Sequence, residues 1–255
     1  MNPDRYDLAL LVAGMPFQGD TLETKSLGGS ETAGLCMARE LAKIGHHVTV
    51  FANCEKPGEY DGVTYRPIMA NGQNQWSAFS MMNPHDIAIA QRLPEVFAPR
   101  LNARLNLLWC HDLALRRDRD KMGGVAWNID KIMVLSQFMK AQYQEVHGLP
   151  DQVFWVTRNG IELDRIRRVR EQLAHEGWPE PERGDMATAP WSHQRDRKKL
   201  MYTARPERGL DALLDVIFPA LLQREPDVRL YLAGYDNTVA EMLPFYQEII
   251  AKISR

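Results

Sequence analysis

The chain has 255 residues, of which 45% are hydrophobic and 25% charged, the composition of an ordinary soluble globular protein. A formal net charge of −2 gives no electrostatic reason to expect nucleic acid as a partner. No apolar run is long enough to cross a bilayer, and we see no signal peptide. We therefore expect a cytoplasmic protein of one large or two small domains, with attachment to the inner face of a membrane as an alternative location.

The segment 27–52, LGGSETAGLCMARELAKIGHHVTVFA, predicts a glycine turn, a helix and a strand. We expect Ser30 to be the N-cap of this helix and Gly45 to end it in a left-handed conformation. Upstream, the continuous apolar run 8–13 predicts a parallel strand that is covered on both faces. The unit is therefore a strand, a long loop, a Gly-Gly turn, a helix and a second strand.

Gly28 and Gly29 allow a ligand to approach the backbone, and the helix start behind them offers N–H groups and a partial positive charge. This combination suits a phosphate. The alternative is a tight turn that binds nothing, because a single glycine-rich turn is weak evidence. The dinucleotide fingerprint G-x-G-x-x-G is absent from this segment.

Strands and helices alternate through the rest of the first part of the chain. We expect a helix that Ser136 caps, that runs to about His147 and that Gly148 stops. The expected strands lie at 63–68, 86–90, 105–109, 131–135 and 153–156. This alternation predicts an α/β fold with a doubly wound parallel sheet, in a domain of residues 1–165.

Residues 166–197 are charged and interrupted by glycine and proline, which predicts a linker or irregular crossover. The α/β pattern restarts over 198–255, with strands at 200–204 and 228–233, a helix at 209–223, and a last helix that a capping box at Thr238 and Glu241 opens. We expect the last helix to bury one stripe, formed by Leu243, Tyr246, Ile250 and Ile253. Two strands cannot complete an open α/β sheet, so the second domain is predicted to be incomplete, and its unpaired edge could support self-association.

Two patterns of charge are interpreted conservatively. The basic clusters at 165–170 and 195–199 fit a solvated face or linker, with an anionic partner such as a lipid surface as the alternative. Asp118 and Asp120 form a D-x-D spacing that can hold Mg²⁺ or Mn²⁺, but they lie in a charged run and not at a predicted strand end. We therefore interpret them as a solvated face and expect no metal.

Ligands of open parallel sheets bind beyond the carboxyl ends of the strands, and chemically useful residues follow several of these ends. His111 could be a general base, a hydrogen-bond partner of the substrate, or a structural loop histidine. Its neighbour Asp112 is expected to cap the next helix. The other candidates are Asn159, Gly160, Arg205, Arg208 and Gly234. Backbone N–H donors on one sheet and guanidinium groups on the other would suit a pyrophosphate between them.

Four segments, in chain order, resemble GT-B-fold retaining glycosyltransferases of the glycogen synthase and sucrose synthase-like group (glycosyltransferase family 4-like). The segments are Gly28-Gly29-Ser30-Glu31 with its helix, 134–138 (VLSQF), 157–162 (TRNGIE), and 202–210 (YTARPERGL) followed by 232–234 (LAG). The resemblance covers nearly the whole chain. It implies a GT-B-like fold made of a complete N-terminal Rossmann-like domain and an incomplete second one.

The resemblance also implies a function, namely transfer of a sugar from a nucleotide-diphosphate sugar to a sugar, lipid-linked or protein acceptor, with retention of configuration and no metal or tightly bound cofactor. Gly28, Gly29 and Ser30 would face the donor phosphates, Asn159, Gly160 and Gly234 would lie on the donor side, Arg205 and Arg208 would stabilise the leaving diphosphate, and His111 would line the sugar pocket. The family usually has Arg and Lys with a longer gap where this chain has its two arginines.

The family also has two glutamates eight positions apart later in the donor domain, and this chain ends before either would occur. We therefore expect a truncated transferase with weak or no turnover. Two alternatives stay open: a non-catalytic GT-B remnant that binds a ligand or partner, and a GT-B-like nucleotide-sugar epimerase, since the fold alone does not fix the reaction.

Overall fold

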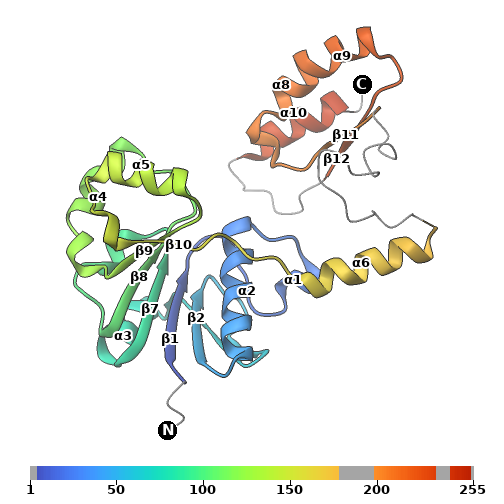
Figure 1. The fold of residues 1–255 in the computed structure, drawn as a ribbon. Helices are drawn as coiled ribbons and strands as arrows, with labels where there is room; N and C mark the ends of the chain where they lie inside the picture. The colour runs from blue at the N-terminus through green and yellow to red at the C-terminus, as the bar shows by residue number, and fades with distance from the viewer. Residues whose placement is uncertain (1–4, 178–197, 234–241, 254–255) are drawn as a thin grey trace. The chain divides into compact units, whose positions relative to one another are not determined.

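The computed structural model describes residues 5–177, 198–233 and 242–253. The chain folds as two compact units, Met1–Glu162 and Leu163–Arg255. The first unit contains an eight-stranded sheet with the order β10-β9-β8-β7-β1-β2-β4-β3, and Figure 1 labels its strands from β10 to β2. Its strands are β1 (Asp7–Val12), β2 (His47–Ala52), β3 (Gly58–Tyr60), β4 (Val63–Pro67), β7 (His85–Gln91), β8 (Ala103–Trp109), β9 (Lys131–Val134) and β10 (Phe154–Val156).

Every pairing in this sheet is parallel except that of β3 with β4 at one edge. The parallel sheet and the predicted strands within it are therefore confirmed. A short antiparallel pair, β5 (Met69–Ala70) and β6 (Gln73–Asn74), lies outside it. From β1 the chain moves outward to β2 and β4, and it then returns to build β7 on the other side of β1. The carboxyl ends of β1 and β7 are thus the point where the winding reverses, which is where such sheets bind ligands.

Two separate cores cover the two faces of the sheet. One face packs against α2 (Gly29–Lys43), and the other packs against α3 (Gln75–Met82), α4 (Arg119–Gly123) and α5 (Gln137–His147). Gly34 brings α2 close to β1, since a Cβ there would lie 2.8 Å from Val12 Cγ2. The remaining short helices are α1 (Thr21–Thr24), η1 (Pro94–Phe97), η2 (Arg116–Asp118), η3 (Ala126–Asn128) and η4 (Asp151–Val153).

The helix ends were predicted with mixed success. The Ser136 side chain accepts a hydrogen bond from the N–H of Met139, and Gly148 ends α5 with φ 68°, as predicted. Gly45 ends α2 with φ 104°, also as predicted. The N-cap prediction for Ser30 is wrong: Gly28 is the N-cap, and the Ser30 hydroxyl instead donates to the Glu31 carboxylate.

The second unit begins with α6 (Leu163–His175), so the segment from 166 to 175 is helical and the prediction of irregular structure there is wrong. Apolar residues at 163, 166, 169 and 173 keep helical spacing, and the glycine and prolines that suggested a linker begin only at 177. The other elements are β11 (Lys199–Tyr202), η5 (Pro206–Arg208), α8 (Leu210–Ala212), the π-helical η6 (Leu213–Ile217), α9 (Phe218–Arg224), β12 (Arg229–Leu232) and α10 (Leu243–Ile253).

In the described part of this unit, β11 and β12 form a two-stranded parallel sheet. The helix expected over 209–223 is divided near Pro219, which lacks the N–H that a regular helix requires. The stripe expected for α10 is partly wrong, because Tyr246 and Ile249 are buried whereas Ile250 is 62% exposed. The predicted capping box at 238–241 lies outside the described residues. None of the described helices is long and apolar enough to span a membrane.

Candidate functional site

A buried carboxylate lies at the start of α2, beside the point where the winding of the sheet reverses. Glu31 is only 4% exposed. Its Oε1 accepts from the N–H of Met15 at 3.2 Å, and its Oε2 accepts from the Ser30 hydroxyl at 2.9 Å. A Cβ at Gly14 or Gly28 would lie 2.0 or 2.3 Å from one of the two carboxylate oxygens. Glycine at these two positions thus leaves room for the carboxylate where it lies.

Gly29 has a different environment from Gly28. A Cβ at Gly29 would meet nothing within 4 Å, so open space lies beside the first turn of α2. The first N–H groups of a helix have no partner within the helix and favour an anion or a hydroxyl oxygen. The Glu31 carboxylate neutralises part of the positive charge at the helix start, which lowers its preference for an anion. The free N–H groups can therefore bind a neutral hydroxyl oxygen as well as an anion.

Gln91 connects the helix start to His111. Gln91 ends β7 with no exposed surface, and its Nε2 lies 2.9 Å from the Ser30 carbonyl oxygen and 2.8 Å from His111 Nε2. The ring of His111 contacts that of Trp109, with 4.6 Å between the centroids. Ser30, Gln91 and His111 thus form one hydrogen-bonded group across α2, β7 and the end of β8.

Burial lowers the pKa of His111 to about 4. The charges around it largely oppose each other: Asp112 and Glu31 raise this pKa, and Arg92 lowers it. Burial thus has the largest effect, because a charged imidazolium is less stable away from water. His111 is consequently neutral at pH 7.

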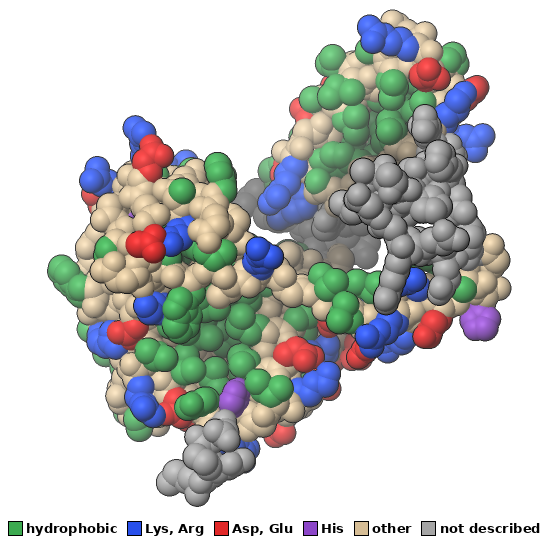
Figure 2. Space-filling view, viewed as in Figure 1, with side chains coloured by type: hydrophobic (Ala, Val, Ile, Leu, Met, Phe, Trp, Pro, Cys, Tyr) green, Lys and Arg blue, Asp and Glu red, His purple; other side chains and the backbone are tan. Residues whose placement is uncertain are grey.

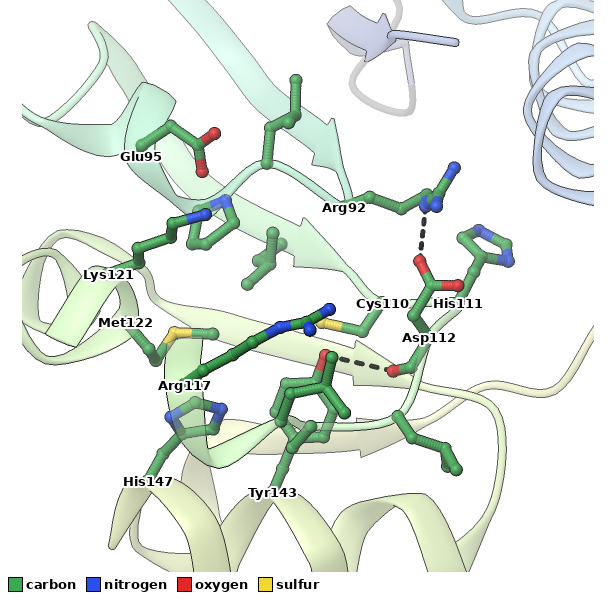
Figure 3. Close-up of a pocket in the computed structure, with 16 residues that line it drawn as sticks. Arg92, Glu95, Cys110, His111, Asp112, Arg117, Lys121, Met122, Tyr143 and His147 are labelled. Atoms are coloured by element: carbon green, nitrogen blue, oxygen red, sulfur yellow. Dashed lines mark hydrogen bonds and ion pairs between the residues drawn. The ribbon is translucent and has the colours of Figure 1, made fainter. Parts of the chain in front are cut away.

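A pocket of about 420 Å³ opens on the other side of His111, at the carboxyl ends of β7 and β8 (Figure 3). Its labelled lining residues are Arg92, Glu95, Cys110, His111, Asp112, Arg117, Lys121, Met122, Tyr143 and His147. Arg92 forms an ion pair with Asp112 at 2.5 Å, and the Tyr143 hydroxyl donates to the Asp112 carbonyl oxygen at 3.2 Å. The N-cap of the next helix, η2, is Leu115, so the expectation that Asp112 caps it is wrong. Burial raises the pKa of Cys110 to about 12, which makes its thiol a poor nucleophile.

Asn159 and Gly160 lie on a segment that leaves the far edge strand β10 and runs toward α2 (Figure 1). Glu162 anchors this segment, because its Oε1 accepts from Cys36 Sγ on α2 at 3.3 Å. The chain turns after β10 at Arg158, which has a left-handed backbone conformation with a φ of 61°. The strand order separates β10 from β1 by three strands, and this segment crosses that distance to reach the middle of α2 at Cys36.

In the second unit, Arg205 and Arg208 lie on either side of Glu207 in one short turn after β11. Arg205 Nε pairs with Glu207 Oε1 at 2.8 Å, and the Tyr246 hydroxyl donates to Glu207 Oε2 at 2.9 Å. Burial raises the pKa of Glu207, but its hydrogen bonds and the two arginines together lower this pKa by more, so the net shift is downward. Arg205 thus already has a carboxylate partner. Gly234 lies outside the described residues.

The candidates identified from sequence are therefore distributed over different places. Gly28, Gly29, Ser30 and His111 come together around Gln91, whereas the two arginines belong to the second unit. Within the described ranges, no three His, Cys, Asp or Glu side chains are grouped so that they could hold a metal ion. Sequence reasoning missed Gly14, Glu31 and Gln91 as parts of the site. Gln91 did carry a signal, as a polar residue that closes the apolar run 87–90 at a strand end.

No family model matches the chain, and no curated protein matches its sequence. The structure is similar to that of a glycosyltransferase from Rickettsia africae ESF-5, with a TM-score of 0.54 and 14% identity over 95% of this chain and 71% of that chain. It is also similar to WaaG, a glycosyltransferase involved in lipopolysaccharide biosynthesis, with a TM-score of 0.57 and 13% identity over 96% of this chain and 68% of that chain. The predicted GT-B-like α/β fold is thereby confirmed.

Proposed function

We propose that this protein is a glycosyltransferase that moves a sugar from a nucleotide-diphosphate sugar to an acceptor. One observation carries the proposal: in a GT-B-like fold, the open start of α2 and the neutral His111 meet at the point where the winding of the sheet reverses. Ligands of open α/β sheets bind at this point. The start of α2 offers N–H donors to an anion or a hydroxyl. Because His111 is neutral, Glu31 is the one charged side chain among the described residues of this hydrogen-bonded group.

The residues have distinct proposed roles. Gly28, Gly29 and Ser30 would face the donor phosphates, and His111 would bind a hydroxyl of the transferred sugar. We propose two domains, 1–165 and 198–255, joined by the crossover 166–197. Arg205 and Arg208 in the second domain would stabilise the leaving diphosphate, a role that fixed positive charge performs well. The other proposed donor contacts are Asn159, Gly160 and Gly234.

We further propose that transfer retains the anomeric configuration and needs no metal. The acceptor would be a sugar, a lipid-linked sugar or a protein, and the pocket beside His111 is large enough for one sugar ring. Turnover by these 255 residues is expected to be weak, because the proposed donor-side sheet has two strands in its described part and supports few fixed contacts.

The proposal is tested by incubating the protein with a panel of nucleotide sugars, each with and without acceptor mixtures. Diphosphate release together with a new glycoside supports the transferase, and proton NMR of the new anomeric centre decides between retention and inversion. Isomerisation of the sugar nucleotide without acceptor would support the epimerase alternative instead. Binding without any turnover would support a non-catalytic remnant, and no binding of any donor would refute the proposal.

We also propose that the protein works at a membrane surface, through α6. This helix exposes an apolar stripe formed by Leu163, Ile166, Val169 and Leu173, which are 40–56% exposed. Arg165, Arg167 and Arg168 lie outside this stripe, whereas Arg170 lies on the same face as Leu163 and Ile166. The helix is thus amphipathic and basic, with one arginine within its apolar face. Figure 2 shows apolar and basic side chains together along this helix. Such helices bind anionic lipid surfaces by burying the apolar stripe among the head groups.

Self-association through the second sheet is a further proposal. β11 and β12 pair only with each other in the described part of the chain, which leaves strand edges that could accept another strand. The apparent molecular mass by light scattering should then rise with protein concentration. A monomeric mass at every concentration would exclude this contact.

A further inference from the structure

The hydrogen bonds of Gln91 determine which nitrogen of His111 carries a proton. Gln91 Nε2 lies 2.9 Å from the Ser30 carbonyl oxygen. A carbonyl oxygen only accepts, so the nitrogen of the amide, and not its oxygen, must face Ser30. Rotating the amide by half a turn would place two oxygens against each other. The orientation of Gln91 is therefore fixed by the backbone of α2.

The same nitrogen lies 2.8 Å from His111 Nε2. An amide nitrogen has two hydrogens and no acceptor capacity, so one hydrogen is donated to Ser30 and the other to His111. His111 Nε2 must then be the accepting, unprotonated nitrogen. In a neutral imidazole the proton is consequently on Nδ1.

We propose that Gln91 is a positioning residue that holds His111 as the neutral tautomer with its proton on Nδ1. His111 Nε2 is then occupied and cannot act as a general base. Nδ1–H remains as a hydrogen-bond donor for a neutral oxygen, such as a hydroxyl of a bound sugar. Only this last step, the identity of the ligand oxygen, rests on the proposed function.

The surroundings of His111 agree with this assignment. In the described part of the chain Nδ1 has no hydrogen-bond partner and is not among the fully buried atoms, so it is available to a ligand. The charged groups nearest to the ring are Glu31 on α2, Asp112 beside it and Arg92 after β7, and their effects on its protonation oppose one another. Burial of the ring therefore decides, and it favours a neutral imidazole over an imidazolium.

The arrangement also has an energetic disadvantage that indicates a specific role. Gln91 Oε1 is buried without a hydrogen-bond partner in the described part of the chain, and an unpaired buried oxygen is destabilising. A leucine or methionine at this position would avoid it. A glutamine is therefore poorly suited to being only a packing residue here, whereas its two N–H donors are both used.

The tautomer can be measured in the full chain with ¹⁵N-labelled histidine and long-range ¹H–¹⁵N correlation spectra at pH 7. The wild-type protein should show a protonated Nδ1 and an unprotonated Nε2 for His111, which His111→Gln identifies by loss of its signals. Gln91→Met should shift His111 toward the tautomer protonated on Nε2, because the donor that keeps Nε2 unprotonated is removed. His85 and His147 are internal controls whose patterns should not change.

A proton on Nε2 in the wild-type protein would overturn the proposal, as would an unchanged Nδ1–H tautomer in a folded Gln91→Met protein. If the variants do not fold, the wild-type spectrum still decides. The test does not need turnover, so the two proposals can fail separately. An Nδ1–H tautomer without transfer from any donor would refute only the function, and transfer with an Nε2–H tautomer would refute only the role of Gln91.

Discussion

Two adjacent glycines at the start of α2 should respond in opposite ways to the same substitution. In Gly28→Ala the new Cβ would lie 2.3 Å from Glu31 Oε2, whereas atoms in such contacts stay at least 3.0 Å apart. The carboxylate would have to move by about 0.7 Å or more, the difference between these two distances. In Gly29→Ala the new Cβ would meet nothing.

The magnitude follows from the contacts of Glu31. Moving the carboxylate disrupts its hydrogen bonds with Ser30 and with the N–H of Met15, and a hydrogen bond to a charged group contributes roughly 1.5–3 kcal/mol. Because the contact falls on the far end of a flexible side chain, the carboxylate can rotate and keep one of these bonds. We therefore expect Gly28→Ala to lower the free energy of unfolding by about 1.5 kcal/mol. Since alanine favours a helix over glycine by up to about 1 kcal/mol, Gly29→Ala should leave the stability unchanged or slightly higher.

Urea denaturation of the full chain, followed by tryptophan fluorescence, measures both effects. With a denaturant slope of about 3 kcal/mol/M, Gly28→Ala should lower the midpoint by about 0.5 M. In a Glu31→Ala background the same substitution should have almost no effect, because the carboxylate that it would contact is absent. Equal midpoints for Gly28→Ala and Gly29→Ala, or an undiminished effect in the Glu31→Ala background, would refute the argument.

Ligand binding should separate the two glycines again. The methyl group of Gly29→Ala would occupy the open space where we propose that the donor phosphates bind, so titration calorimetry should give at least about tenfold weaker binding of the donor. The stability of the same variant serves as its own control. Unchanged affinity would mean that the donor does not approach this turn.

Three further predictions follow from other parts of the structure. Because the pKa of His111 is lowered to about 4 in the folded protein and is near 6.5 when unfolded, its neutral form contributes stability above pH 6.5 that is lost as the pH falls toward 4. Urea midpoints should therefore fall less for His111→Gln than for the wild type between pH 7 and 5. Arg205→Ala combined with Arg208→Ala should abolish diphosphate binding in calorimetry while circular dichroism stays unchanged, and retained binding would place the diphosphate elsewhere. Arg165→Gln with Arg168→Gln should weaken sedimentation with anionic vesicles roughly thirtyfold, at about 1 kcal/mol per charge, and equal binding to neutral vesicles would contradict an electrostatic attachment.

The regular parts of the fold could be predicted from the sequence because local signals were sufficient. The apolar runs at 8–13 and 87–90 indicated buried parallel strands, and Ser136 and Gly148 marked both ends of a helix. The N-cap prediction for Ser30 was wrong because serine is common both at N-caps and in the first turn of helices. Only the burial of Glu31, a tertiary feature, decided that its hydroxyl would turn toward the carboxylate.

The candidate site could be predicted only in part for the same reason. Strand ends identified His111 and the glycine turn, since parallel strands bring their carboxyl ends to one edge. Gln91 was missed because its importance comes from two partners, 61 and 20 residues away in sequence. The failure at 166–175 was different, because a high density of charge was interpreted as irregular structure although the apolar spacing was helical.

The asymmetric covering of the sheet has a consequence for its dynamics. One face depends mainly on α2, which also forms the start of the candidate site. A ligand held at the first turn of α2 would therefore oppose local opening of this helix and protect the amides of β1 and β2 from hydrogen exchange, while the face under α4 and α5 would change less. Occupancy of the site and the local stability of half the sheet should thus be thermodynamically linked.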